Sequence, residues 1–149
     1  MTELTDSFAI FTYGTLQPNG RYWPQVEDFV THHVAATING YTLWHLPEGY
    51  PAILEGEGTV HGRLLFVERA RLHAALIAFD RIEDFVVDDP GSLYERVRLF
   101  ATHDDATTEA FGYLYHPNRR GYVLATGVPV TDGDWNRHVK HPTACAQEI

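Results

Sequence analysis

One stretch near the start of the chain limits the possible folds more than any other. Residues 8–16 read Phe-Ala-Ile-Phe-Thr-Tyr-Gly-Thr-Leu, a run of apolar neighbours broken by a glycine. Because such a run is apolar on both pleat faces, it predicts a strand buried on both sides that ends in a tight loop. Since Gly14 can adopt positive φ, the N–H groups of Gly14, Thr15 and Leu16 are expected to face one point and bind a carboxylate or an oxyanion. The alternative is an ordinary turn at Gly14.

Composition narrows the class of protein. A chain of 149 residues is expected to form a single domain, residues 1–149, that buries about 70% of its unfolded surface without needing a metal or disulfide. The formal charge is −9 and the longest basic cluster is Arg119-Arg120, so nucleic acid is not an expected partner. The single cysteine, Cys145, can close no intramolecular bridge, and no run has the length of a membrane span or a signal-peptide core. We therefore expect a cytoplasmic protein with no membrane partner.

The region after the first loop is rich in turn signals and β-forming residues. Two short strands are expected within Val34–His45, separated by a turn at Asn39-Gly40. Residues 46–52 contain two prolines and a glycine and should form an ordered loop, and residues 55–58, Glu-Gly-Glu-Gly, should form another turn. A further strand is predicted over Thr59–Val67.

From Glu68 the apolar spacing changes to that of a helix. The recurring residues are Leu72, Ala75, Leu76, Phe79 and Ile82, which predict a helix of about four turns. At 100° per residue, Glu83 lies about 20° around the axis from Leu76, so its carboxylate is predicted to face the core at the end of this helix. Desolvation and the negative end of the helix dipole both disfavour an ionised carboxylate there, which suits acid–base catalysis near neutral pH.

Glu83 also has a simpler interpretation. It could end the helix in solvent, or pair with an arginine such as Arg96, because structural ion pairs also perturb acids. Asp80 and Asp84 fall off the apolar stripe and are interpreted as solvated surface charges.

Two more strands are predicted beyond the turn at residues 88–92. Leu93–Ala101 alternates, with Tyr94 on the same face as two arginines, and Glu109–Tyr115 carries three aromatic side chains on one face around Gly112, where a close approach or a bulge is expected. Asp104-Asp105 marks the tip of a hairpin that joins the two strands. The chain is then turn-rich, and residues from about 137 to 149 are expected to form a mobile tail.

No metal or cofactor is expected. Among nine histidines only His32-His33 and the pair His138 and His141 stand close together, and neither has the ligand spacing of a zinc site. The chain has no glycine-rich phosphate loop with its lysine and no Gly-x-Ser-x-Gly elbow, and Cys145 lacks the context of a nucleophile.

Five motifs, taken in order, carry a family resemblance. They are Phe11-Thr-Tyr-Gly-Thr-Leu16, Gly49-Tyr-Pro-Ala52, Asp80-Arg-Ile-Glu-Asp84, Ser92-Leu-Tyr-Glu-Arg96 and Asp132-Gly-Asp-Trp135. With these motifs the chain resembles the gamma-glutamylcyclotransferase-like superfamily over nearly its whole length. The resemblance implies an α+β fold: a small mixed β-barrel with one main helix and short flanking helices, and a cavity at one mouth. It also implies that the loop from Tyr13 to Leu16 holds the substrate and that Glu83 is the catalytic acid–base.

The function implied by this resemblance is release of 5-oxoproline from a small-molecule gamma-glutamyl amide, without a cofactor. The α-amine of such a substrate is its own nucleophile, and attack on the γ-carbonyl closes a five-membered ring. Tyr13 and Tyr94 are expected to orient the substrate through their hydroxyls, or to be core residues with satisfied hydroxyls. Two alternatives remain open: a non-catalytic module that binds a small ligand or a protein, and an amide hydrolase in which Glu83 activates water.

The chain departs from the family pattern after the glutamate. Many members have glycine there and a short link to the tyrosine, whereas here Asp84 follows Glu83 and ten residues separate Glu83 from Tyr94. The link between Glu83 and Tyr94 is expected to border the mouth of the cavity. Its length is therefore expected to affect the size and identity of the leaving group that the cavity accepts.

Overall fold

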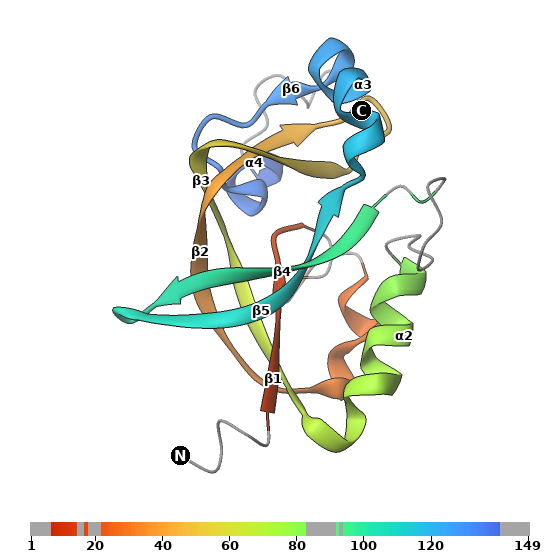
Figure 1. Ribbon diagram of the computed structural model, residues 1–149, viewed down its shortest axis with the longest axis vertical. Coiled ribbons are helices and arrows are strands. Elements are labelled where there is room, and N and C mark those ends of the chain that lie inside the picture. Colours follow the sequence, from red (N-terminus) through yellow and green to blue (C-terminus); the bar gives the residue numbers. More distant parts are fainter. Residues whose placement is uncertain (1–6, 15–16, 18–21, 83–91, 93, 141–149) are drawn as a thin grey trace.

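The structure of the protein, a computed structural model, describes residues 7–14, 17, 22–82, 92 and 94–140. Its strands are β1 (Ser7–Thr12), β2 (Val30–His45), β3 (Pro51–Glu68), β4 (Tyr94–His103), β5 (Ala106–Tyr115) and β6 (Val128–Pro129). Its helices are α2 (Leu72–Ile82), α3 (Arg120–Thr126) and α4 (Trp135–Lys140), with 3-10 turns η1 (Trp23–Gln25), η2 (Glu27–Phe29), η3 (Arg69–Arg71) and η4 (Pro117–Arg119). One curved sheet with a few helices is the α+β class that the sequence predicts (Figure 1).

The sheet curves until it closes on itself. The strand order is β3–β1–β5–β4–β2–β6, and β3 also pairs with β2, so five strands form a ring. β1 lies between β3, to which it is antiparallel, and β5, to which it is parallel. Its Phe11 belongs to a core cluster drawn from all five ring strands, whereas Ile10 belongs to a second cluster beneath α2. The predicted burial of this strand on both faces is therefore confirmed.

The strands β2 and β3 are longer than the sequence predicts. The turn expected at Asn39-Gly40 is a shift in the register of one continuous strand, with Gly40 at φ +90°. The turn expected at residues 55–58 lies inside β3, where a Cβ on Gly58 would come within 2.8 Å of the Tyr41 carbonyl oxygen. Both predictions were wrong, because in a sequence the glycine of a register shift, like Gly40, and a glycine that lets two strands approach closely, like Gly58, resemble glycines that turn the chain.

The β4–β5 hairpin follows the prediction. Asp104 and Asp105 form its tip with φ values of +48° and +63°, the combination that a tight two-residue hairpin turn requires. Gly112 in β5 makes room for a neighbour, because a Cβ there would lie 2.7 Å from Cδ2 of Leu99. The hairpin and the close approach at Gly112 are both confirmed.

Helix α2 covers the outer face of the ring with its predicted apolar stripe (Figure 1). Ala75 and Phe79 are buried, and Leu76 and Ile82 are partly buried against the same cluster. Three turns of helix with this stripe are held by packing against the sheet, because a helix of this length is only marginally stable alone.

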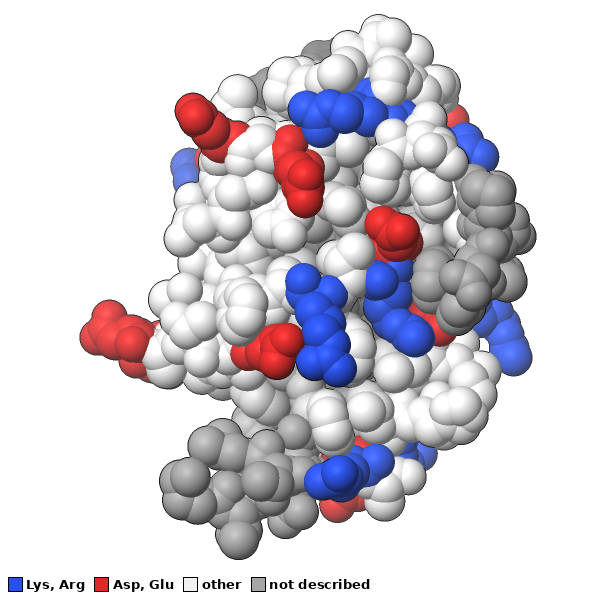
Figure 2. All heavy atoms as spheres, in the orientation of Figure 1, with Lys and Arg blue, Asp and Glu red and all other residues white. Residues whose placement is uncertain are grey.

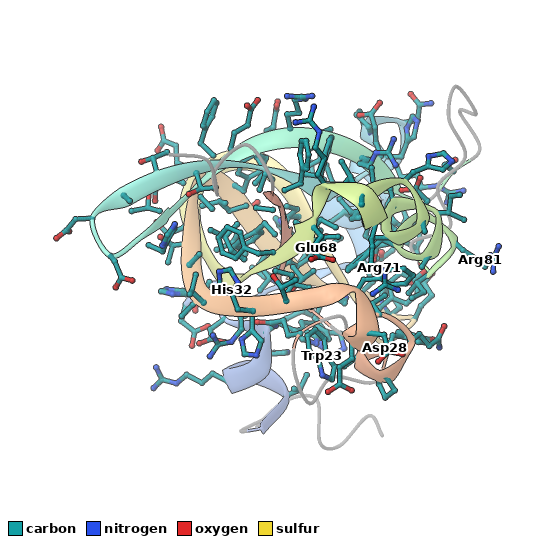
Figure 3. The ribbon with its side chains drawn as sticks, turned by 90° about the horizontal axis from the view of Figure 1, so that it is seen from below. Trp23, Asp28, His32, Glu68, Arg71 and Arg81 are labelled. Atoms are coloured by element: carbon teal, nitrogen blue, oxygen red, sulfur yellow. The ribbon has the colours of Figure 1, made fainter. Side chains whose placement is uncertain are left out.

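The start of α2 is anchored by a preceding turn. Arg71 donates a hydrogen bond of 2.6 Å to the carbonyl oxygen of Asp28 and lies 4.6 Å from the centre of the Phe29 ring, so η2 packs at the foot of the helix (Figure 3). Arg81, at the other end of α2, points away from the sheet (Figure 3). The helix therefore lies in a fixed direction across the ring.

The last third of the chain contains two helices that the apolar spacing does not reveal, α3 and α4. Each is too short to show a helical period in its sequence. The tail expected from about residue 137 begins within α4, and residues 141–149 lie outside the described residues. No helix in the described part of the chain has the length and apolar character needed to cross a bilayer.

Charged side chains of both signs are interspersed on the face shown in Figure 2. An exposed pair on the β4–β5 hairpin, Arg98 with Glu109, has a separation of 3.3 Å, and such pairs contribute little to stability. A shorter and partly buried pair joins α2 to the hairpin, Asp80 with Arg96, and it belongs to the candidate site described next.

Candidate active site

The structure describes some of the predicted site residues and leaves others out. Glu83, Thr15 and Leu16 lie outside the described residues. Tyr13, Gly14 and Tyr94 are described, and all three are buried. The contacts of these three residues define the site that can be built from the structure.

Pro51 is the point at which three of the sequence motifs meet. A Cβ on Gly14 would lie 2.5 Å from Cγ of Pro51, so the glycine loop after β1 lies directly against the proline ring. The Tyr94 hydroxyl donates a hydrogen bond of 2.5 Å to the Pro51 carbonyl oxygen. The end of β1, the start of β3 and the start of β4 are therefore in contact at one residue.

The structure explains the need for a glycine at position 14 differently from the sequence prediction. The φ of Gly14 lies outside the range from +20° to +160°, so the expected left-handed conformation was wrong. The space taken by the Pro51 ring is what excludes a side chain there. The Gly14 carbonyl oxygen accepts hydrogen bonds from the backbone N and from Nε2 of Gln17, both at 3.2 Å, which closes the turn. Binding of an anion by the N–H groups of Gly14, Thr15 and Leu16 stays a prediction.

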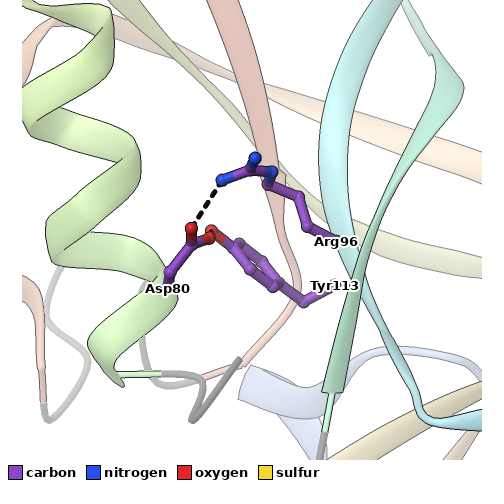
Figure 4. Close-up of polar contacts among 3 residues, drawn as sticks. All are labelled: Asp80, Arg96 and Tyr113. Carbon is purple, nitrogen blue, oxygen red and sulfur yellow. Dashed lines mark hydrogen bonds and ion pairs between the residues drawn. The ribbon is translucent and has the colours of Figure 1, made fainter. Parts of the chain in front are cut away.

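Asp80 links the last turn of α2 to the β4–β5 hairpin. Its Oδ2 lies 2.6 Å from Nη1 of Arg96, and its Oδ1 accepts a hydrogen bond of 2.6 Å from the Tyr113 hydroxyl (Figure 4). The Asp80 and Arg96 side chains are only 18% and 22% exposed. The interpretation of Asp80 as a solvated charge was therefore wrong. A residue beside the apolar stripe is solvated only if no neighbouring element reaches it, and here the hairpin supplies two partners.

Tyr113 also connects this ion pair to the glycine loop. Its carbonyl oxygen accepts a hydrogen bond of 2.7 Å from the Tyr13 hydroxyl, while its own hydroxyl binds Asp80. Hydrogen bonds therefore run from the residue before Gly14, through β5, to Asp80 in α2, which stands three residues before Glu83 in the sequence. This network fixes the end of α2 relative to the glycine loop.

We expect Asp80→Asn to lower the free energy of unfolding by about 1–3 kcal/mol, because Arg96 then loses its counter-charge in a partly buried position. Glu109→Gln is the matched control, since it removes the carboxylate from the exposed pair with Arg98 and should cost under about 1 kcal/mol. Urea denaturation of both variants measures the difference. Equal losses would contradict a special role for the Asp80 pair.

Three phenol rings pack together beside Pro51. The Tyr94 ring meets Tyr115 edge-on with centroids 5.1 Å apart and lies 6.3 Å from Tyr50. Burial, reinforced by Tyr115, raises the pKa of Tyr50 to about 12, and burial also raises the pKa of Tyr115. Both phenols therefore stay protonated near neutral pH, where they act as hydrogen-bonding groups and not as bases.

Sequence reasoning missed the contacts of Pro51, Asp80 and Tyr113, although the first two stand inside the quoted motifs. The position of Tyr113 opposite Arg96 could have been found from the predicted hairpin. Once its tip is placed at Asp104-Asp105, counting back along both strands pairs Arg96 with Tyr113, as the structure has them. No comparable rule connects Pro51 to Gly14, because their contact depends on how the whole ring closes.

Elsewhere, the described part of the chain contains a separate hollow but no cluster of metal ligands. Among the described residues, no group of three or more His, Cys, Asp or Glu side chains could hold a metal ion. A hollow of about 490 Å³ is lined by residues of several strands, with Phe8 of β1, Phe66 of β3 and Phe111 of β5 among them. Tyr13, Gly14 and Tyr94, the predicted site residues that the structure describes, do not line this hollow, and neither does Pro51.

The fold and the site together define a class: a small α+β protein with a ring-shaped sheet and a partly buried polar network at the end of its main helix. By sequence, residues 10–137 match the family described as gamma-glutamyl cyclotransferase, AIG2-like. The chain belongs to this family, which confirms the resemblance carried by the motifs. A sequence search of curated proteins finds no match.

Several solved structures have a similar fold. An AIG2-like protein from Mus musculus is 25% identical, with 76% of this chain and 82% of that chain covered and a TM-score of 0.50. A protein from Arabidopsis thaliana is 24% identical over 95% of this chain and 79% of that one, with a TM-score of 0.60. A uropathogenic E. coli-specific protein is 15% identical over 91% and 97%, with a TM-score of 0.62. These similarities support the ring-shaped α+β fold.

Proposed function

We propose that the chain is a gamma-glutamyl cyclotransferase, which converts a small gamma-glutamyl amide to 5-oxoproline and a free amine. One observation carries the proposal beyond family membership. Gly14, Pro51, Tyr94 and Asp80 come from four of the family motifs, and contacts within the site bring them together. Glu83, the proposed acid–base, directly follows Ile82, the last residue of α2.

The reaction uses groups that the substrate already carries. The α-amine attacks the γ-carbonyl carbon, a new C–N bond closes the five-membered ring, and the bond from that carbon to the leaving nitrogen breaks. Water is not consumed. Because nucleophile and electrophile belong to one molecule, the protein needs to hold the bent conformer, stabilise the oxyanion and move protons.

In this proposal Glu83 moves both protons. It first accepts a proton from the substrate ammonium group, which generates the nucleophilic amine, and releases this proton to solvent. After the attack it accepts the second proton from the ring nitrogen and donates it to the departing nitrogen, so the products are the neutral lactam and the free amine. A single carboxylate is sufficient because both nitrogens are bonded to the same tetrahedral carbon in the intermediate. Positioned acid–base groups of this kind contribute about 10²- to 10⁴-fold to a rate.

The remaining predicted site residues hold the substrate. The N–H groups of Gly14, Thr15 and Leu16 bind the α-carboxylate or the oxyanion, and losing one oxyanion donor typically costs about 3–4 kcal/mol. Tyr13 and Tyr94 donate their hydroxyl protons to main-chain carbonyls, so a hydrogen bond from the substrate must use the lone pairs of their oxygens. Both tyrosines also fix the loop and Pro51 in place.

The test is a product assay with purified protein and a panel of gamma-glutamyl amino acids, gamma-glutamylamines and glutathione. Chromatography should detect 5-oxoproline and the free amine in equal amounts, and boiled protein should give neither. Glutamate in place of 5-oxoproline would favour an amide hydrolase in which Glu83 activates water. Binding of a substrate without any turnover across the panel would favour a non-catalytic binding module.

We propose the cytoplasm as the site of this reaction, with residues 1–149 forming one domain. The single cysteine is compatible with a reducing compartment, and the proposed chemistry needs neither an oxidant nor a membrane.

A further inference from the structure

Thr12 carries a buried hydroxyl that the fold does not use. The residue is 4% exposed, and its Oγ1 has no hydrogen-bond partner among the described residues. Burying a hydroxyl without a partner is unfavourable, and nearly all buried polar side chains have one. An unused hydroxyl in the middle of a family motif therefore calls for a partner beyond the described residues, and a bound ligand is one that the position of Thr12 allows.

The side chain of Thr12 belongs to the face of β1 that carries Ile10. Side chains alternate along a strand, and Phe11 and Tyr13 belong to the cluster inside the ring, whereas Ile10 belongs to the cluster beneath α2. Thr12 therefore lies on the outer face, on the side of the sheet that α2 covers.

Its neighbours place it beside the candidate site. Ile10 pairs with Phe111 in the parallel β1–β5 ladder, so two residues further along both strands Thr12 is level with Tyr113. The Tyr113 hydroxyl binds Asp80 in the last turn of α2, and Gly14 follows two residues after Thr12. The unused hydroxyl is therefore between the glycine loop and the end of α2, where the proposed reaction takes place.

Stability alone does not favour threonine at this position. Valine has nearly the same shape, is equally suited to a strand, and would leave no unpaired group. A hydroxyl in this position has an advantage only when something binds to it.

We propose that the Thr12 hydroxyl donates a hydrogen bond to an oxygen of the gamma-glutamyl group and so helps to select this substrate. The inference rests on the proposed function. A neutral donor that is buried and prealigned discriminates against compounds that lack the matching oxygen, because its desolvation is then not compensated. Thr12 is a substrate-binding residue in this proposal and takes no part in proton transfer.

The test compares Thr12→Val with Thr12→Ser in the full chain. Thr12→Val should raise KM for the best gamma-glutamyl substrate about 10-fold and weaken binding of 5-oxoproline, measured by calorimetry, to a similar extent. Its thermal unfolding midpoint should be unchanged or higher, because the unpaired hydroxyl is gone. Thr12→Ser keeps the donor and should stay within about 3-fold of the wild-type KM.

The kinetic constants also identify the oxygen that is bound. A rise in KM with unchanged kcat indicates the α-carboxylate, which is the same in the ground state and the transition state. A fall in kcat indicates the γ-carbonyl oxygen, on which charge develops during the reaction. Either result supports the proposal.

Three results would overturn it, and they are distinguishable. Wild-type kinetics and 5-oxoproline affinity in Thr12→Val would remove Thr12 from the site while leaving the proposed function intact. Equal losses of affinity and of thermal stability in the valine and serine variants would reveal a structural role. If the wild-type protein neither turns over the panel nor binds 5-oxoproline, the proposed function fails and this inference fails with it.

Discussion

Glu83→Gln is expected to lower the rate of 5-oxoproline release by about 10²- to 10⁴-fold, the range for loss of a positioned acid–base group. Glutamine has the size of glutamate but can neither accept a proton from the attacking nitrogen nor donate one to the leaving nitrogen. The loss should appear in kcat, and binding of 5-oxoproline should be retained, because the glycine loop is untouched. Steady-state kinetics and calorimetry on the same preparation measure both quantities.

Asp84→Asn is the matched control for this variant. It removes one carboxylate from the adjacent position, and since that side chain is predicted to lie off the apolar stripe, its kcat should stay within about 2-fold of wild type. A pH profile adds a second criterion: the rising limb of kcat/KM that reports the free enzyme's base should be absent in Glu83→Gln and present in Asp84→Asn. A Glu83→Gln variant with the wild-type rate would exclude Glu83 as the proton carrier.

The parts of the fold that were predictable are those whose sequence signal is local. The apolar stripe of α2, the apolar run of β1 and the turn at Asp104-Asp105 are each contained within about a dozen residues, so their spacing alone identifies them. Two of these elements, β1 and α2, also lead into motifs, which is why Gly14 and Asp80 stood in the quoted motifs before their contacts were known.

The contacts themselves depend on closure of the ring. Asp80 was assigned to solvent because a helical stripe reports only on the surface directly beneath the helix, whereas its partners come from strands more than a dozen residues later. The glycines at 55–58 were assigned to a turn because a sequence does not state which strand lies opposite. In both cases the missing information is long-range pairing, which no local period contains.

Gly14 illustrates the same limit within a motif. A glycine was predicted to be needed at this position for a local reason, a positive φ. The structure gives a steric reason: the ring of Pro51, 37 positions further along the chain, takes the space of a side chain. This difference has a practical consequence, because a steric cause can be relieved by changing the second partner and a conformational cause cannot.

Gly14→Ala is therefore expected to reduce kcat/KM by about 10²-fold. Its Cβ would lie 2.5 Å from Cγ of Pro51, and ordinary contact begins at 3.4 Å, so the loop or the proline must move by about 0.9 Å. A displacement of about 1 Å at a catalytic site costs about 10²-fold in rate, and overpacking lowers the free energy of unfolding by about 1–3 kcal/mol. Gly121→Ala is the control, because a Cβ there meets nothing within 4 Å and alanine is favoured in a helix.

The double variant Gly14→Ala with Pro51→Ala separates the two possible causes. Alanine at position 51 removes the Cγ that the new Cβ would meet, so if the overlap is responsible, the second substitution should restore part of the stability and activity that the first one removes. Pro51→Ala alone keeps the carbonyl that accepts the Tyr94 hydroxyl, so its own effect should be smaller than that of Gly14→Ala. Additive losses, with no restoration, would mean that Gly14 is required by the conformation of its loop and not by its contact with Pro51.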